Sequence, residues 1–196
     1  MWIVPETAAC GGNEPDPVTA AHMCELAGVE GIVCHLREDR RHINDRDLRL
    51  LRQTIKTKLD LEMAATDEIV EIAIQTRPEL ATLVPERRQE LTTEGGLRVT
   101  EQRQHLEAVV NTLRKNGIAV SLFVDPEREQ VEAAKEIGAD MIEIHTGEYA
   151  TVTSEREQHA ELVKIQTIAR LGKSLGLQNS WRSNRTIQTR SIPQPR

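Results

Sequence analysis

Aromatic residues are scarce in this sequence: its 196 residues include one phenylalanine, one tyrosine and two tryptophans. Proteins that bind single-stranded nucleic acid commonly stack the bases on aromatic side chains, so this class of protein is disfavoured. The formal net charge of -6 also argues against a general nucleic-acid binder. Aliphatic side chains must fill the core, and the hydrophobic content of 38% is enough for one soluble domain.

Cysteine is also sparse, and its spacing argues against two kinds of site. None of Cys10, Cys24 and Cys34 belongs to a C-x-x-C pair, so we expect neither a disulfide framework nor a zinc site. No pair of histidines has convincing metal-ligand spacing, and we therefore predict no metal. Three unpaired cysteines suit the reducing cytoplasm, which is the location that we expect.

Long hydrophobic runs are missing as well. No apolar run approaches the length that crosses a membrane, and residues 1–7 lack a basic segment followed by a long apolar one. We therefore expect no membrane segment and no secretion signal.

The sequence does contain a regular alternation of strand and helix patterns. Capping residues mark helix starts: Asp16 precedes Pro17 at one, and Asp125 precedes Pro126 at another. Such alternation predicts βαβ units, a parallel sheet and therefore an α/β fold. The five expected strands are Gly31–His35, Leu59–Met63, Leu80–Pro85, Ile118–Val124 and Met141–His145.

The pattern divides the chain into three parts. Residues 1–10 show no clear period, residues 11–177 carry the strands and helices, and residues 178–196 contain four arginines, no acid and few aliphatic side chains. We expect this last segment to be a disordered basic tail, because it cannot bury enough apolar surface to become ordered.

A polar stretch, residues 34–47, follows the first expected strand and contains two histidines and four arginines. His35 should end the strand, at the edge where an α/β barrel keeps its active site. The alternative interpretation is a solvated run of charges that pair with one another. Four side chains beyond His35 could donate hydrogen bonds to a phosphate or carboxylate: Arg37, Arg40, Arg41 and His42.

Two glutamates, Glu62 and Glu143, interrupt the apolar strands. A carboxylate inside a strand is costly unless it has a partner or a function, so both are candidate catalytic residues. The alternative is a buried ion pair with an arginine of the polar stretch. Residues 92–96, T-T-E-G-G, could bind an anion through hydroxyl and amide groups, or could be only a flexible turn.

Several longer motifs together resemble the pyridoxine 5-phosphate synthase family of the deoxyxylulose-dependent vitamin B6 pathway. The resemblance covers residues 11–177. It implies a homo-oligomeric α/β (TIM) barrel that condenses two partners, 1-deoxyxylulose 5-phosphate and 3-amino-1-hydroxyacetone 1-phosphate, without a metal or an organic cofactor. The motifs are H-L-R-E-D-R-R-H-I from His35, L-E-M from Leu61, L-V-P-E from Leu83, T-T-E-G-G-L from Thr92, V-S-L-F from Val120 and I-E-I-H-T-G from Ile142.

The resemblance also implies roles for the residues at the matching positions. Arg37 and His42 resemble ligands of the deoxyxylulose phosphate, and Thr92 resembles another substrate contact. Three positions resemble catalytic residues of the family: His35 a general base, Glu62 a second proton acceptor, and Glu143 a stabiliser of the transition state.

The resemblance is lost at both ends of the chain. The family's first strand carries an N-x-D-H motif, and its seventh carries a G-H-G motif whose histidine donates a proton; residues 1–10 and 178–196 match neither. We therefore expect an incomplete barrel with about strands 2 to 6 of eight. Two functions stay open: the family's enzyme, or an inactive truncated homologue that only binds phosphate or a partner subunit.

Overall fold

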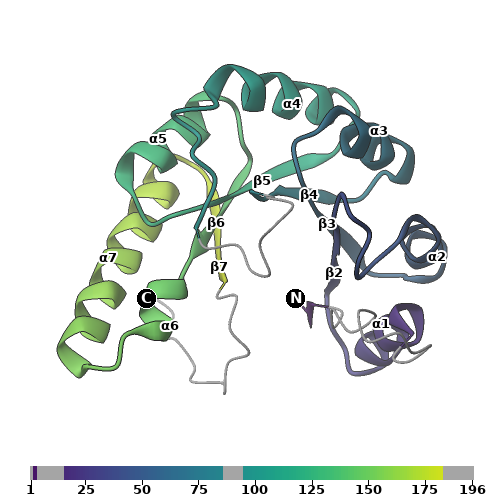
Figure 1. The fold of residues 1–196 in the computed structure, drawn as a ribbon, viewed down its shortest axis with the longest axis horizontal. Helices are drawn as coiled ribbons and strands as arrows, with labels where there is room; N and C mark the ends of the chain where they lie inside the picture. The colour runs from purple at the N-terminus through teal and green to yellow at the C-terminus, as the bar shows by residue number, and fades with distance from the viewer. Residues whose placement is uncertain (1, 4–15, 86–94, 183–196) are drawn as a thin grey trace.

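The computed structural model describes residues 2–3, 16–85 and 95–182. Seven parallel strands form one sheet in the order of the chain, and helices lie in an arc around the strands (Figure 1). The strands are β1 (Trp2–Ile3), β2 (Gly31–Leu36), β3 (Lys58–Met63), β4 (Leu80–Leu83), β5 (Ala119–Val124), β6 (Met141–His145) and β7 (Gln178–Arg182). The helices are α1 (Pro17–Leu26), α2 (Asp45–Thr54), α3 (Asp67–Thr76), α4 (Arg103–Lys115), α5 (Arg128–Glu136), α6 (Gly147–Thr151) and α7 (Glu155–Ser174).

Local sequence signals set the start of several helices. The carboxylate of Asp16 accepts a hydrogen bond from the backbone N–H of Thr19 at the start of α1. Asn44 and Asp47 form a reciprocal capping box at α2. The hydroxyl of Ser154 caps α7. These caps satisfy backbone donors that have no partner within the helix, and they fix where the connecting loops end.

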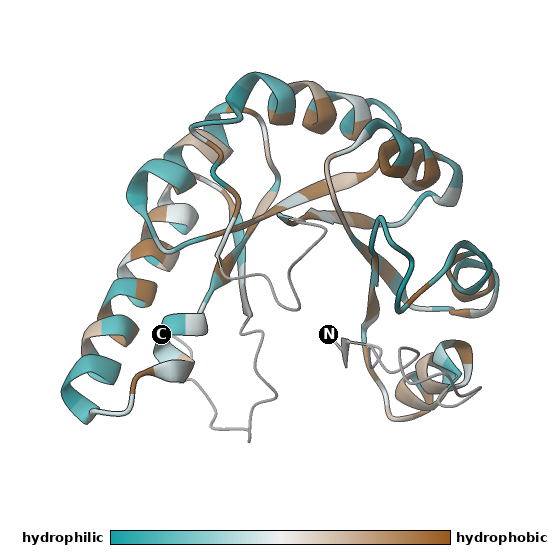
Figure 2. Ribbon diagram, viewed as in Figure 1, coloured by the Kyte–Doolittle hydropathy of each residue, from teal (hydrophilic) through white to brown (hydrophobic). Residues whose placement is uncertain are grey.

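The hydrophobic core lies between the sheet and the helices. Side chains alternate along a strand, and one alternate set from β2 to β6 is apolar and almost fully buried. The helices meet this set with their own apolar side chains, and Figure 2 shows brown segments in the strands and along the helices. Each fully buried aliphatic side chain contributes about 1.5–3 kcal/mol. The strand residues of the core include Ile32, Cys34, Leu36, Leu59, Leu61, Met63, Ala81, Leu83, Val120, Leu122, Val124, Ile142 and Ile144.

The predicted α/β fold with a parallel sheet is confirmed, and the five predicted strands correspond to β2–β6. The sheet is wider than predicted, because β1 extends it beyond β2 and β7 extends it beyond β6. The expectation of only about strands 2 to 6 was therefore wrong. The sheet is open as described: β1 and β7 stand at opposite ends of the strand order, and no ladder joins them within the described residues.

The prediction that residues 178–196 form a disordered tail is wrong for the first five of these residues, which form β7. The backbone N–H of Gln178 donates to the carbonyl of Asp140 at 3.1 Å, and pairing with β6 continues in register. The side-chain amide of Asn179 donates to the carbonyl of Ala169 on α7 at 2.7 Å. These hydrogen bonds hold an edge strand without a hydrophobic period. Residues 183–196, and the segment 1–10 apart from β1, lie outside the described residues.

Two helices also differ from the prediction. Helix α5 begins at Arg128 and not at Asp125–Pro126, because the carboxylate of Asp125 makes tertiary contacts instead of capping the helix. The five-residue helix α6 is too short to show a hydrophobic period, and the sequence did not predict it.

Candidate active site

The face of the sheet away from the helical core carries buried polar side chains. His35 on β2, Glu62 on β3, Thr82 on β4 and Ser121 on β5 are successive register partners, so they stand in one row. All four are 9% exposed or less. Buried polar groups without a structural role are costly, so a row of them on one face marks a candidate site.

His35 and Glu62, two of the predicted catalytic residues, lie side by side. Nδ1 of His35 is 3.9 Å from Oε2 of Glu62, and the two side chains are 9% and 3% exposed. This separation is longer than a hydrogen bond, and it leaves the two groups in adjacent positions. An imidazole beside a carboxylate can take up and return protons in a reaction with several transfers.

Glu143, the third predicted catalytic residue, is buried on β6 and only 3% exposed. Burial, with the negative charge of Asp60 as a second cause, raises the pKa of Glu143 to about 8. Asp60 itself accepts a hydrogen bond from the hydroxyl of Thr82 at 2.9 Å. Within the described part of the chain, Glu143 forms no ion pair with an arginine, unlike the alternative considered above. At neutral pH its carboxyl keeps a proton and can donate a hydrogen bond.

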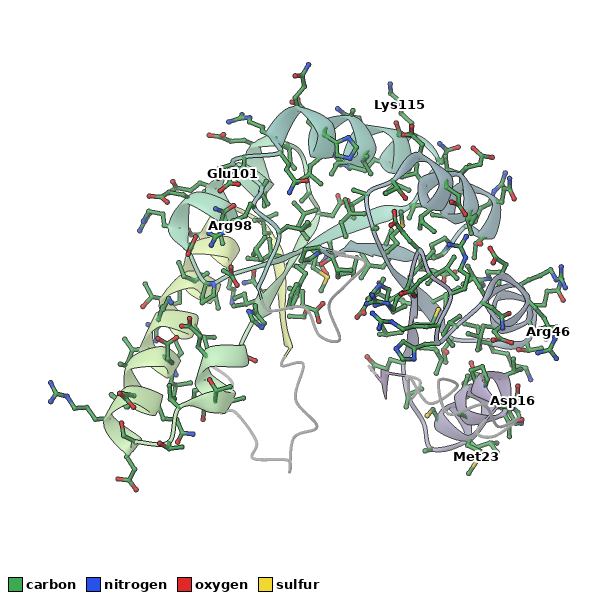
Figure 3. All side chains as sticks on the ribbon, in the orientation of Figure 1. Asp16, Met23, Arg46, Arg98, Glu101 and Lys115 are labelled. Atoms are coloured by element: carbon green, nitrogen blue, oxygen red, sulfur yellow. The ribbon has the colours of Figure 1, made fainter. Side chains whose placement is uncertain are left out.

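Arg37, a predicted phosphate ligand, is 8% exposed and lies at the end of β2. Its Nε donates to Oδ1 of Asp39 at 3.3 Å, and Nε of Arg41 lies 3.3 Å from Oδ2 of the same carboxylate. His42 is half-buried on the same loop. Arg46, by contrast, projects outward from α2 (Figure 3) and its side chain is 64% exposed. The polar stretch therefore contains two kinds of arginine, and only those next to β2 belong to the candidate site.

Arg40 was predicted to be a donor to a bound anion, but its guanidinium binds protein groups instead. Its guanidinium contacts the carboxylates of Asp45 and Glu68. Nη1 donates to the backbone carbonyl of Glu38 at 2.9 Å and to that of Arg37 at 3.3 Å. Protein groups thus use the donors that a bound phosphate would need.

Thr92, the remaining predicted substrate contact, lies outside the described residues. The two glycines that follow are described, and they pack on the end of β5. The N–H of Gly96 donates to Oδ1 of Asp125 at 2.9 Å. A Cβ at Gly96 would lie 2.2 Å from the backbone nitrogen of Asp125, so only glycine fits. For Gly96, the interpretation as merely a flexible turn is therefore wrong.

Sequence analysis did not predict the pairing of Asp125 with His145. Nδ1 of His145 lies 3.0 Å from Oδ1 of Asp125, and this hydrogen bond lowers the pKa of the carboxyl. The His145 ring also packs edge-on against Phe123. Asp125 directly follows β5 and His145 is the last residue of the neighbouring β6, which is the signal that could have found the pair. They line a cavity of about 350 Å³ together with Arg98, Tyr149 and Lys164 among others.

Two kinds of feature are absent from the described residues. No group of three or more histidine, cysteine, aspartate or glutamate side chains in the described ranges could hold a metal ion. None of the described helices is both long enough and apolar enough to cross a membrane.

Comparison with known proteins gives concordant matches. The family model described as "Pyridoxal phosphate biosynthesis protein PdxJ" matches residues 7–181. The pyridoxine 5'-phosphate synthase of Trichlorobacter lovleyi is 63% identical over 169 residues, which cover 86% of this chain and 71% of that protein. The corresponding synthase of Geobacter sulfurreducens is 59% identical over 169 residues, with the same coverage of both chains.

A solved structure shows the same kind of fold. The crystal structure of mandelate oxidase with a difluorinated hydroxy acid superposes with a TM-score of 0.55 at 12% sequence identity. The match covers 83% of this chain and 56% of the oxidase chain. At this level of identity the likeness bears on the fold alone, and it agrees with the parallel α/β arrangement described above.

Proposed function

Since this chain belongs to the PdxJ family of pyridoxal phosphate biosynthesis proteins, we propose that it is a pyridoxine 5'-phosphate synthase. Its substrates would be 1-deoxyxylulose 5-phosphate and 3-amino-1-hydroxyacetone 1-phosphate, the two partners that the family condenses. The proposal includes the cytoplasm as the place of the reaction and a homo-oligomeric assembly.

The observation that carries the proposal is the His35–Glu62 pair on the polar face of the sheet. Ring closure through imine formation and loss of water needs several proton transfers between positioned acids and bases. In the proposed mechanism His35 removes a proton from the sugar phosphate, and Glu62 accepts a second proton. Because both groups are already buried and adjacent, little reorganisation is needed when the substrate binds.

Glu143 would act in its neutral form. With a pKa of about 8, its carboxyl keeps its proton at neutral pH. A protonated carboxyl can donate a hydrogen bond to an oxygen that gains negative charge in the transition state, as an ionised one cannot. This fits the stabilising role that the family resemblance implies for Glu143.

The substrate phosphate would be held by Arg37 and His42, with Thr92 as a further contact. Arg37 is preoriented by Asp39 at the carboxyl end of β2, next to His35. A guanidinium in that place can bind phosphate oxygens through two parallel hydrogen bonds.

A second candidate function is favoured by the open sheet, in which β1 and β7 stand at opposite ends of the strand order. The chain would then bind a sugar phosphate or a partner subunit and would catalyse no reaction. In this second candidate function the anion site is retained, and His35 and Glu62 transfer no protons.

One experiment separates the two candidates. The purified 196-residue chain is incubated with both substrates, formation of pyridoxine 5'-phosphate is followed by chromatography, and binding of the sugar phosphate is measured by calorimetry. Turnover supports the synthase, while binding without turnover supports the second candidate. The absence of both binding and turnover would contradict the synthase and the sugar-phosphate form of the second candidate.

A further inference from the structure

We propose that Arg40 is a positioning residue for the phosphate site: it fixes the backbone of the anion loop, residues 37–42, so that Arg37 and His42 face the bound anion. The inference rests on the proposed function, because it takes Arg37 and His42 as the phosphate ligands. Arg40 itself would not touch the substrate.

The guanidinium of Arg40 joins three separate parts of the chain. Nη1 donates to two carbonyls of the anion loop, those of Arg37 and Glu38. Nε lies 3.1 Å from Oδ2 of Asp45, the first residue of α2. Nη2 contacts Oε1 of Glu68 in the first turn of α3. The N–H donors of the planar guanidinium, called the fork below, thus connect the loop to the starts of two helices. Those helices are anchored in the core.

The backbone of the loop depends on the same residue. The N–H of Arg40 donates to the carbonyl of Arg37 at 3.0 Å, which closes a turn immediately after β2. Arg40 has a φ of 53°, in the left-handed region that a residue with a Cβ rarely adopts. Such a conformation persists where surrounding contacts compensate for its cost, and clusters at ligand sites. The side-chain fork of Arg40 supplies those contacts.

The charge of Arg40 is already compensated. Asp45 and Glu68 place two carboxylates against one guanidinium, so the group adds little positive potential for an incoming phosphate. Its contribution is therefore expected to be geometric. A loss of geometry near a bound substrate can weaken binding or rate by about a hundredfold for a displacement of about 1 Å.

The test uses the 196-residue chain with Arg40→Gly, because glycine accepts the positive φ while removing the fork. The probes are 1-deoxyxylulose 5-phosphate and inorganic phosphate, titrated by calorimetry. We expect affinity for both to fall about tenfold or more, with Arg40→Lys intermediate because lysine keeps the charge but not the fork. The matched control is Arg103→Ala, which removes an exposed ion pair with Glu136 on distant helices. We expect this control to bind both probes as the unaltered chain does.

Glu68→Ala distinguishes geometry from charge. Removing this exposed carboxylate makes the neighbourhood more positive, so a purely electrostatic role for Arg40 predicts tighter phosphate binding. A positioning role predicts weaker binding, because the fork loses its anchor on α3. Tighter binding by Glu68→Ala, or equal affinities for Arg40→Gly and Arg103→Ala, would overturn the inference.

Hydrogen exchange gives a readout that does not depend on the phosphate ligands. Amide exchange in residues 37–42 should be faster in Arg40→Gly than in Arg103→Ala, while exchange in the core strands stays the same. Unchanged exchange in the loop would overturn the positioning role. Failure of the unaltered chain to bind phosphate, with faster loop exchange in Arg40→Gly, would instead count against the proposed ligands.

Discussion

The imidazole of His35 and the carboxylate of Glu62 face each other across β2 and β3, with Nδ1 3.9 Å from Oε2. The two residues are register partners, so the hydrogen-bonded ladder itself sets their separation. Their strands carry fully buried apolar residues on the opposite face. A catalytic pair built on strands in this way is held more exactly in place than one built on loops.

Substitution of Arg37 tests the phosphate site. Arg37→Ala should weaken binding of inorganic phosphate by about tenfold to a hundredfold, because a hydrogen bond to a charged group contributes about 1.5–3 kcal/mol. Arg103→Ala, which removes an exposed arginine on α4, should leave the affinity unchanged. Calorimetric titration of the two variants measures the difference. Equal losses would show that the polar stretch is only a solvated run of charges.

Glu143 should make stability depend on pH. An unfolded glutamate titrates near pH 4.3, whereas burial raises the pKa of Glu143 to about 8 in the fold. Between these values the folded state holds a proton that the unfolded state has released. The free energy of unfolding should therefore fall as pH rises from about 4.3 to about 8, by an amount on the order of a few kcal/mol.

Glu143→Gln tests this dependence, because glutamine resembles the neutral carboxyl. Urea unfolding at about pH 5 and about pH 8 should show a smaller loss of stability for the variant than for the unaltered chain. Glu107→Gln, at an exposed position on α4, is the control and should keep the original slope. A slope that survives in Glu143→Gln would mean that Glu143 is ionised in the fold.

The two neighbouring glycines after the T-T-E motif, Gly95 and Gly96, should differ sharply in how well they tolerate substitution by alanine. A Cβ at Gly96 would clash with the backbone of Val124 and Asp125, so Gly96→Ala should cost about 2–4 kcal/mol. Among the described residues, a Cβ at Gly95 would meet only the carboxylate of Asp125, 3.4 Å from Oδ2 and 3.8 Å from Oδ1, and Gly95→Ala should cost less than about 1 kcal/mol. Urea unfolding of both variants gives the comparison. Similar costs would contradict the close packing of Gly96 on β5.

The sequence was sufficient to predict the central strands, because their apolar runs and the flanking caps are local signals. It also singled out Glu62 and Glu143, because each is a carboxylate within an otherwise apolar strand, and both are buried in the structure. It could not show that the guanidinium of Arg40 binds protein carboxylates, since one of these belongs to Glu68, 28 residues further along the chain. The edge strand β7 was missed for a similar reason: backbone pairing with β6 holds it, and its side chains show no period.

The central claim is that His35 and Glu62 act together in forming pyridoxine 5'-phosphate. The most direct test is the rate of product formation by the unaltered chain, His35→Gln, Glu62→Gln and the double variant, with the exposed His159→Gln as control. We predict that each single substitution lowers kcat/KM about a hundredfold to ten-thousandfold, and that the double variant loses little more than the worse single one. Full activity in His35→Gln, or losses that simply multiply in the double variant, would contradict the account.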